Sequence, residues 1–150
     1  MHFSLVDRVL ERGSERIVTL KQVSRAEEYL LDHFATYPVL PGVFMLESMV
    51  QAARLLAEGE REATALPMVL CRVRALKYGS FVRPGYTMRV EVDRTARADG
   101  ELQEFKGIVR LLDPAKPGEA IATACAGRFG LRPARSPTPS VVRPEPAPIG

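Results

Sequence analysis

An apolar run near the middle of the chain constrains the fold more than any other feature of the sequence. It begins after Pro41-Gly42 and ends shortly before Gly59, and these are residue types that commonly open and close a helix. Its apolar residues leave little room for a polar face, and a helix that is apolar nearly all round is a buried helix. The apolar residues are Val43, Phe44, Met45, Leu46, Met49, Val50, Ala52, Ala53, Leu55, Leu56 and Ala57.

Strand-like segments on both sides of this helix supply a surface that can bury it. Apolar and charged residues alternate in 87–97, which is the period of a strand with one wet face. Turn signals such as Asp99-Gly100 and Asp113-Pro114 join neighbouring segments and favour an antiparallel sheet. We therefore predict an α+β architecture in which one long buried helix is wrapped by an antiparallel sheet. Strands are predicted at 3–10, 16–23, 67–78, 87–97, 102–112 and 119–129, with a short helical turn within 25–32.

Composition bounds the protein class and the domain organisation. The chain has 150 residues, of which 46% are hydrophobic and 26% charged, as expected for one globular domain. No apolar run approaches the roughly 18 residues that a membrane-spanning helix needs, and the charged N-terminal segment does not resemble a secretory signal. We therefore expect a cytoplasmic protein. Because residues 131–150 contain six of the twelve prolines, we predict a folded domain at 1–130 followed by a flexible tail.

The small net charge and the scarcity of Cys and His argue against two further classes, a nucleic-acid-binding domain and a protein-built metal site. The net charge is only +3 and much of it falls within the predicted tail, so the body of the domain is not expected to bind nucleic acid. Cys71 and Cys125 lie in apolar runs without CxxC spacing and are predicted to be buried free thiols. With only His2 and His33 in addition, no metal site built by the protein is expected.

Two polar features near the helix are candidates for chemistry. Glu47 interrupts the apolar helix; if buried without a cation it is a candidate proton donor, with Gln51 one turn further on as its hydrogen-bond partner. His33 precedes the helix, whose first turn, from Gly42 on, would present unpaired N–H groups able to hold a polarised carbonyl oxygen. Each feature also has an ordinary interpretation: Glu47 solvated at the helix edge, His33 structural, and Pro-Gly simply starting a helix.

Together these residues form a pattern. The segment DHFATYPVLPGVFMLESMVQAARLL resembles the active-site segment of the β-hydroxyacyl-acyl-carrier-protein dehydratases, whose motif G-H-F-x-G-x-P-x-x-P-G precedes an acidic residue and then Gln. YGSFVRPGYTM resembles the family's F-K-x-P-V-x-P-G-D turn, and FSLVDRVL its opening strand, so that the resemblance spans roughly residues 3–129. The residues in register are His33, Phe34, Pro38, Pro41, Gly42, Glu47, Gln51, Val82, Pro84 and Gly85.

The resemblance implies a hotdog fold that works as a homodimer or a trimer of dimers. It implies reversible loss of water from a 3-hydroxyacyl thioester on acyl carrier protein, in fatty-acid or related polyketide synthesis, without a metal or redox cofactor. His33 would be the base, and Glu47 of the neighbouring subunit, oriented by Gln51, would protonate the departing hydroxyl. The Gly42 N–H after Pro41 would hold the thioester oxygen.

The same resemblance implies an acidic carrier protein as partner. Four basic residues near the expected tunnel mouth are candidates to dock it by charge complementarity, although an ordinary solvated strand face has the same pattern. They are Arg72, Arg74, Lys77 and Arg83.

Departures from the family motifs leave alternatives open. They motivate a non-catalytic acyl-binding hotdog subunit as the second interpretation, and a hotdog acyl-thioesterase is the third. We expect the loop after His33 to follow a different path, since a β-branched Thr tolerates positive φ poorly. The departures are Asp32 for Gly, Ala35-Thr36 for Pro-Gly, Gly79-Ser80-Phe81 for the family's basic-Arg-Pro run, and Tyr86 for Asp.

Overall fold

Six strands form a single sheet in the computed structural model. Every neighbouring pair is antiparallel, and the strand order is β1-β2-β4-β5-β6-β3. The elements are β1 (Arg8–Arg12), β2 (Arg16–Gln22), the 3-10 helix η1 (Glu28–Leu30), α1 (Gly42–Glu58), β3 (Met68–Tyr78), β4 (Thr87–Arg97), β5 (Gln103–Leu112) and β6 (Ala120–Pro133). The structure describes residues 3–34, 36–62, 65–97, 102–116 and 118–135.

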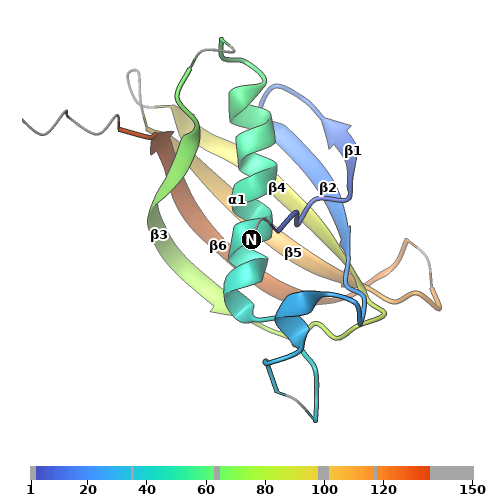
Figure 1. Ribbon diagram of the computed structural model, residues 1–150. Helices are drawn as coiled ribbons and strands as arrows, with labels where there is room; N and C mark the ends of the chain where they lie inside the picture. The colour runs from blue at the N-terminus through green and yellow to red at the C-terminus, as the bar shows by residue number, and fades with distance from the viewer. Residues whose placement is uncertain (1–2, 35, 63–64, 98–101, 117, 136–150) are drawn as a thin grey trace, which may run out of the picture.

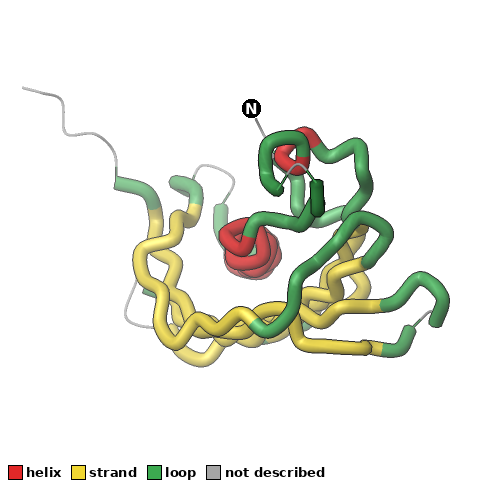
Figure 2. Tube along the Cα trace, turned by 90° about the horizontal axis from the view of Figure 1, so that it is seen from below, coloured by secondary structure: helices red, strands yellow, loops and turns green. Residues whose placement is uncertain are grey.

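The helix α1 lies in the concave face of the curved sheet (Figures 1 and 2). Met49 and Ala53 on the helix are fully buried. Beneath them the rings of Phe105 on β5 and Phe129 on β6 stack with centroids 5.6 Å apart. The predicted α+β architecture, one long helix wrapped by a curved antiparallel sheet, is confirmed.

Only the face of α1 that points to the sheet is buried. On the opposite side Val43 is 64% exposed and Leu55 is 39% exposed. The prediction of a helix buried all round is therefore wrong for the single chain. The N-terminal segment and the start of β3 lie beside this outer face, Tyr29 of η1 packs on Phe44, and Arg12 of β1 donates to the Leu55 carbonyl. A groove lined largely by apolar residues stays open along the helix (Figure 1).

Phe3 and Leu5, before β1, pair with a helix side chain and not with a strand. Gln51 Oε1 accepts a hydrogen bond from the Leu5 amide at 2.8 Å, and Gln51 Nε2 donates to the Phe3 carbonyl at 3.0 Å. Leu5 is fully buried by this contact. The strand predicted at 3–10 consequently begins only at Arg8, because the preceding backbone groups are already satisfied by Gln51.

The end of the folded domain also differs from the prediction. β6 runs to Pro133, and Leu131 is fully buried between β3 and β5, so the strand passes the predicted boundary at residue 130. Residues 136–150 of the predicted tail and the Asp99-Gly100 turn lie outside the described residues.

The two cysteines have different environments. Cys125 is buried, as predicted, and burial raises the pKa of its thiol to about 11. Cys71 is exposed on β3, so its predicted burial is wrong: β3 is the last strand of the sheet and has no neighbour to cover it. Both are free thiols.

Replacing Gln51 by Leu should loosen the N-terminal segment. The change removes the partners of the Leu5 N–H and the Phe3 carbonyl, and leaving such groups unpaired costs about 1–3 kcal/mol of unfolding free energy. Urea unfolding should show this loss, and amide hydrogen exchange should be faster at Leu5. Gln22→Leu, at an exposed position of β2, is the matched control. Unchanged exchange at Leu5 in Gln51→Leu would contradict the anchoring role.

Candidate active site

His33 lies in the loop between η1 and α1, with its ring fixed by two contacts. Its Nδ1 is 2.8 Å from the Val39 carbonyl oxygen. Because a carbonyl only accepts, Nδ1 is the nitrogen that holds the hydrogen, and the neutral ring has its lone pair on Nε2. The ring also packs edge-on against Phe34 at 4.6 Å. His33 is thus held in the tautomer that accepts a proton at Nε2.

The loop around His33 keeps an unusual backbone conformation. Phe34 has a φ of 53°, in the left-handed region that bulky residues rarely adopt. Asp32 and Thr36 are exposed. Ala35, part of the loop predicted to change its path, lies outside the described residues. Strain of this kind clusters at functional sites.

A cavity of about 360 Å³ opens beside His33 at the N-terminal end of α1. Its polar lining groups are His33 and Ser80, together with the phenol of Tyr78 and the Gly42 backbone. The remaining walls are mostly apolar, and such a site excludes water and strengthens the hydrogen bonds made within it. The other lining residues are Phe34, Val39, Leu40, Met45, Gly79 and Phe81.

The start of α1 presents backbone donors to this cavity. Pro41 is the N-cap residue and gives the helix no side-chain cap. The Phe44 N–H donates to the Pro41 carbonyl at 2.9 Å, which leaves the Gly42 and Val43 N–H groups as the donors at the start of the helix. The positive end of the helix dipole lies at the same place. A carbonyl oxygen bound here would meet donors that stabilise negative charge, as an oxyanion hole does.

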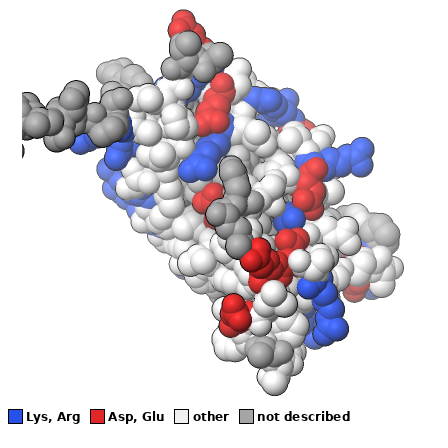
Figure 3. All heavy atoms as spheres, viewed as in Figure 1, with Lys and Arg blue, Asp and Glu red and all other residues white. Residues whose placement is uncertain are grey.

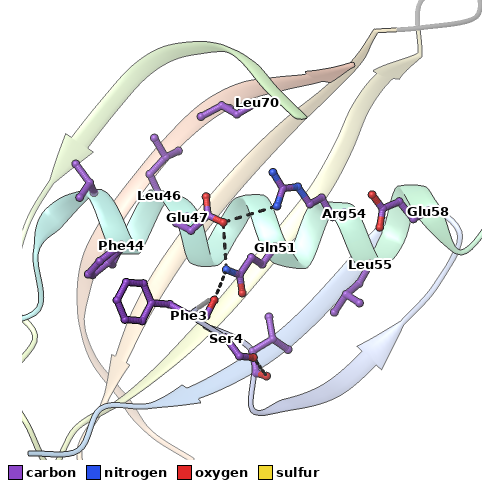
Figure 4. Close-up of a pocket in the computed structure, with 12 residues that line it drawn as sticks. Phe3, Ser4, Phe44, Leu46, Glu47, Gln51, Arg54, Leu55, Glu58 and Leu70 are labelled. Atoms are coloured by element: carbon purple, nitrogen blue, oxygen red, sulfur yellow. Dashed lines mark hydrogen bonds and ion pairs between the residues drawn. The ribbon is translucent and has the colours of Figure 1, made fainter. Parts of the chain in front are cut away.

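Glu47 does not line this cavity. It lines a groove of about 800 Å³ along the outer face of α1 (Figure 4). Its side chain is 36% exposed, so it is neither deeply buried nor fully solvated. Gln51 Nε2 donates to Glu47 Oε1 at 3.1 Å, which confirms the predicted hydrogen bond. Arg54 Nη1 lies 3.8 Å from the same oxygen. The carboxylate thus has one hydrogen-bond donor and one ion-pair partner on its own helix.

Helix geometry explains why His33 and Glu47 of one chain do not line the same cavity. Five residues separate Gly42 from Glu47, which turns the side chain by about 140° around the helix axis. Gly42 therefore borders the cavity of His33, whereas Glu47 borders the outer groove. Of the predicted site residues, the structure groups His33 with Gly42 and Glu47 with Gln51.

The four basic residues predicted to lie near the tunnel mouth are exposed, but two of them are already engaged. Arg72 forms an ion pair with Glu104 at 3.0 Å, and the Arg83 guanidinium lies over the rings of Tyr37 and Tyr86. On the helix-bearing face acidic and basic side chains are interspersed (Figure 3). Arg74 and Lys77 have no ion pair within the described part of the chain. These two are therefore more available to a partner than Arg72 and Arg83.

Two residues of the site were missed by sequence reasoning. Arg54 lies seven residues after Glu47, two turns along the same face, and this spacing was a usable signal. Tyr78 gave no such signal, since its orientation depends on a register shift in β3 between Arg74 and Lys77.

Features that would point to other site classes are not found in the described ranges. No helix there is both long enough and apolar enough to cross a membrane. The same ranges hold no group of three or more His, Cys, Asp or Glu side chains arranged to hold a metal ion.

Comparisons with known proteins identify the family of the chain. The family model of the FabA-like domain matches residues 1–124. The chain is 32% identical to a 3-hydroxyacyl-[acyl-carrier-protein] dehydratase FabZ of Bacillus pumilus, covering 81% of this chain and 75% of the relative. It is 38% identical to a FabZ of a Polaromonas species, covering 79% of each chain.

Solved structures share the fold. A chain of the dehydratase heterocomplex ApeI:P from Xenorhabdus doucetiae superposes with a TM-score of 0.61 and 17% identity, covering 87% of this chain and 99% of that one. The Streptococcus mutans protein smu.793, solved with acetyl CoA, gives a TM-score of 0.62 and 11% identity, covering 89% and 92%. The predicted hotdog fold and the predicted family are confirmed, and the chain belongs to the FabA-like family that includes the FabZ dehydratases.

Proposed function

We propose that the chain catalyses the reversible dehydration of 3-hydroxyacyl thioesters to trans-2-enoyl thioesters, with an acyl carrier protein presenting the acyl chain. Its FabZ relatives bear the name of this reaction and are similar over most of their length, which supports the activity predicted from the sequence. The observation that carries the proposal within the fold is His33, held with Nε2 free beside the uncapped start of α1.

The chemistry needs a base and a polarised carbonyl. The proton next to a thioester is only weakly acidic, so its removal requires stabilisation of the enolate oxygen. In the proposed mechanism the thioester oxygen accepts hydrogen bonds at the Gly42 end of α1. His33 Nε2 then takes the proton from the carbon next to the carbonyl.

Glu47 completes the reaction from a second copy of the chain. The outer groove of α1 is largely apolar and β3 is an exposed edge strand, and both features favour burial against another copy. In the proposed homodimer Glu47, held by Gln51, faces the partner subunit's cavity. Glu47 donates its proton as the carbon–oxygen bond breaks, the hydroxyl leaves as water, and the electrons of the former C–H bond form the double bond.

The two alternative functions make different predictions for the same assay. A thioesterase would release free thiol from an acyl thioester, whereas a dehydratase would leave the thioester intact. A non-catalytic subunit would bind the acyl carrier protein without turnover. The replacement of the family's Gly by Asp32 directly before His33 is the observation that favours this second candidate.

Substitution of either proposed acid–base group should abolish turnover without unfolding the protein. Hydration of a trans-2-enoyl thioester on acyl carrier protein, followed by loss of enoyl absorbance, should fall about 10²–10⁴-fold in His33→Ala and in Glu47→Gln. Glu58→Gln is the matched control, because Glu58 lies on the same helix and borders the same groove. Near-normal rates in either site variant, with circular dichroism unchanged, would refute its assigned role.

Mixing the two inactive variants should restore activity if the site is shared between subunits. In a mixed dimer of His33→Ala and Glu47→Gln, one of the two sites has both groups intact. Random reassociation should therefore recover about a quarter of wild-type activity, given an isologous dimer. A mixture of His33→Ala with the double variant should stay inactive. No recovery in the first mixture would show that the groups do not act across an interface.

A further inference from the structure

Tyr78 is the last residue of β3 and borders the cavity that also contains His33 and Gly42. Its side chain is half exposed at the cavity mouth, and the proposed mechanism has so far given it no role. Its position depends on an irregularity in the strand before it.

A β-bulge turns Tyr78 toward the helix. Arg74 pairs with Arg128, but Lys77 pairs with Ala126, so β3 has one residue more than β6 over this stretch. Ala75, within the bulge, has a φ of 49°. Without the extra residue Tyr78 would share the outer face with Arg74, because side chains four apart in a regular strand point the same way.

The register after the bulge confirms this inward orientation. Tyr78 pairs directly with Cys125, whose side chain is fully buried in the core. Directly opposed residues on neighbouring strands project from the same face of the sheet. Bulges next to active sites commonly re-aim a side chain in this way.

The phenol ring lies against the first residue of α1. A Cβ atom added at Gly42 would be 3.1 Å from Tyr78 Cε1 and 3.2 Å from Cζ, the carbon that bears the hydroxyl. The hydroxyl end of the ring is therefore at the first turn of the helix, beside the Gly42 backbone. A side chain at position 42 would crowd the ring and displace it by a few tenths of an ångström.

We propose that the Tyr78 hydroxyl is a second hydrogen-bond donor to the thioester carbonyl oxygen, acting beside the Gly42 N–H. This inference rests on the proposed dehydratase function and adds a catalytic residue to the same site. The donor strengthens its hydrogen bond as negative charge develops on the oxygen, so it should contribute mainly to the rate of the chemical step.

Two further observations agree with this role. In the F-K-x-P-V-x-P-G-D motif the residue in register with Tyr78 is Phe, so the hydroxyl distinguishes this chain from the motif and is not needed to fill the space. Partial burial, with a smaller contribution from the Cys125 thiol, raises the pKa of Tyr78 and so keeps the hydroxyl protonated.

Tyr78→Phe removes the donor while keeping the ring. We expect kcat for enoyl-thioester hydration to fall about 100-fold, the lower end of the range for loss of an oxyanion donor, with a smaller change in KM. Isotope-edited infrared spectra of bound crotonyl-pantetheine labelled with ¹³C at its carbonyl supply a second readout. The carbonyl stretch should lie at higher frequency in Tyr78→Phe than in wild type.

Tyr37→Phe is the matched control, since Tyr37 has almost the same exposure (52% against 51% for Tyr78) but does not line the cavity. Equal rates and equal carbonyl frequencies in wild type and Tyr78→Phe would overturn the role of Tyr78 and leave the dehydratase proposal standing. An inactive wild type would contradict the proposed function, and the infrared comparison would still decide whether Tyr78 contacts the carbonyl. Absence of saturable thioester binding to wild type would overturn both.

Discussion

The burial of one apolar helix in the concave face of a single antiparallel sheet is the constraint on which the rest of the structure depends. The sheet has to let the helix approach closely at its centre. It does so at Gly107 in β5, where an added Cβ would overlap the buried side chain of Met49. Phe105 on the same strand and Phe129 on β6 fill the space beside this contact. A close-packed interior of this kind tolerates little displacement, so the path of α1 is well determined.

The position of α1 in turn decides what each side of the helix can do. Its first turn meets the end of β3 and the His33 loop, which makes the N-terminal end a place where backbone donors and a base converge. Glu47 is turned away from that end by the helical repeat and borders the outer groove. A single copy therefore offers two half-sites, and the proposed catalysis joins them by pairing two copies. Assembly and activity would then depend on the same apolar surface.

Much of the fold could be predicted from the sequence because its signals are local. The bounds of α1 follow from Pro41-Gly42 and Gly59, and the alternation in β4 reproduces that strand at Thr87–Arg97. The first strand was predicted too early because its apolar residues look the same whether they pair with a strand or with the side chain of Gln51, 46 residues away. Tertiary hydrogen bonds of this kind leave no periodic signal.

The candidate site was predictable to the extent that it lies on one continuous motif. His33, Gly42, Glu47 and Gln51 were found from spacing, and the resemblance supplied their roles. Spacing did not show that His33 lines the cavity at the start of α1 whereas Glu47 lines the outer groove. That difference depends on which elements pack around each side of the helix. The orientation of Tyr78 was hidden for a different reason: a bulge at Ala75 reverses the parity of the strand, and nothing in the composition of β3 marks an alanine as the residue with positive φ.

The departures from the family motif at the end of β3 are physically linked. Gly79 replaces a basic residue, and an added Cβ there would overlap the backbone carbonyl oxygen of Thr123 on β6. The Gly79 amide donates to the Ala124 carbonyl at 2.9 Å, so the chain leaves β3 in close contact with β6. This close approach holds the preceding residue, Tyr78, in the cavity wall against Gly42. A larger residue at 79 would push the strand end outward, and the phenol would then move away from the helix. The glycine and the tyrosine are therefore better understood as one local change than as two independent losses of the family pattern.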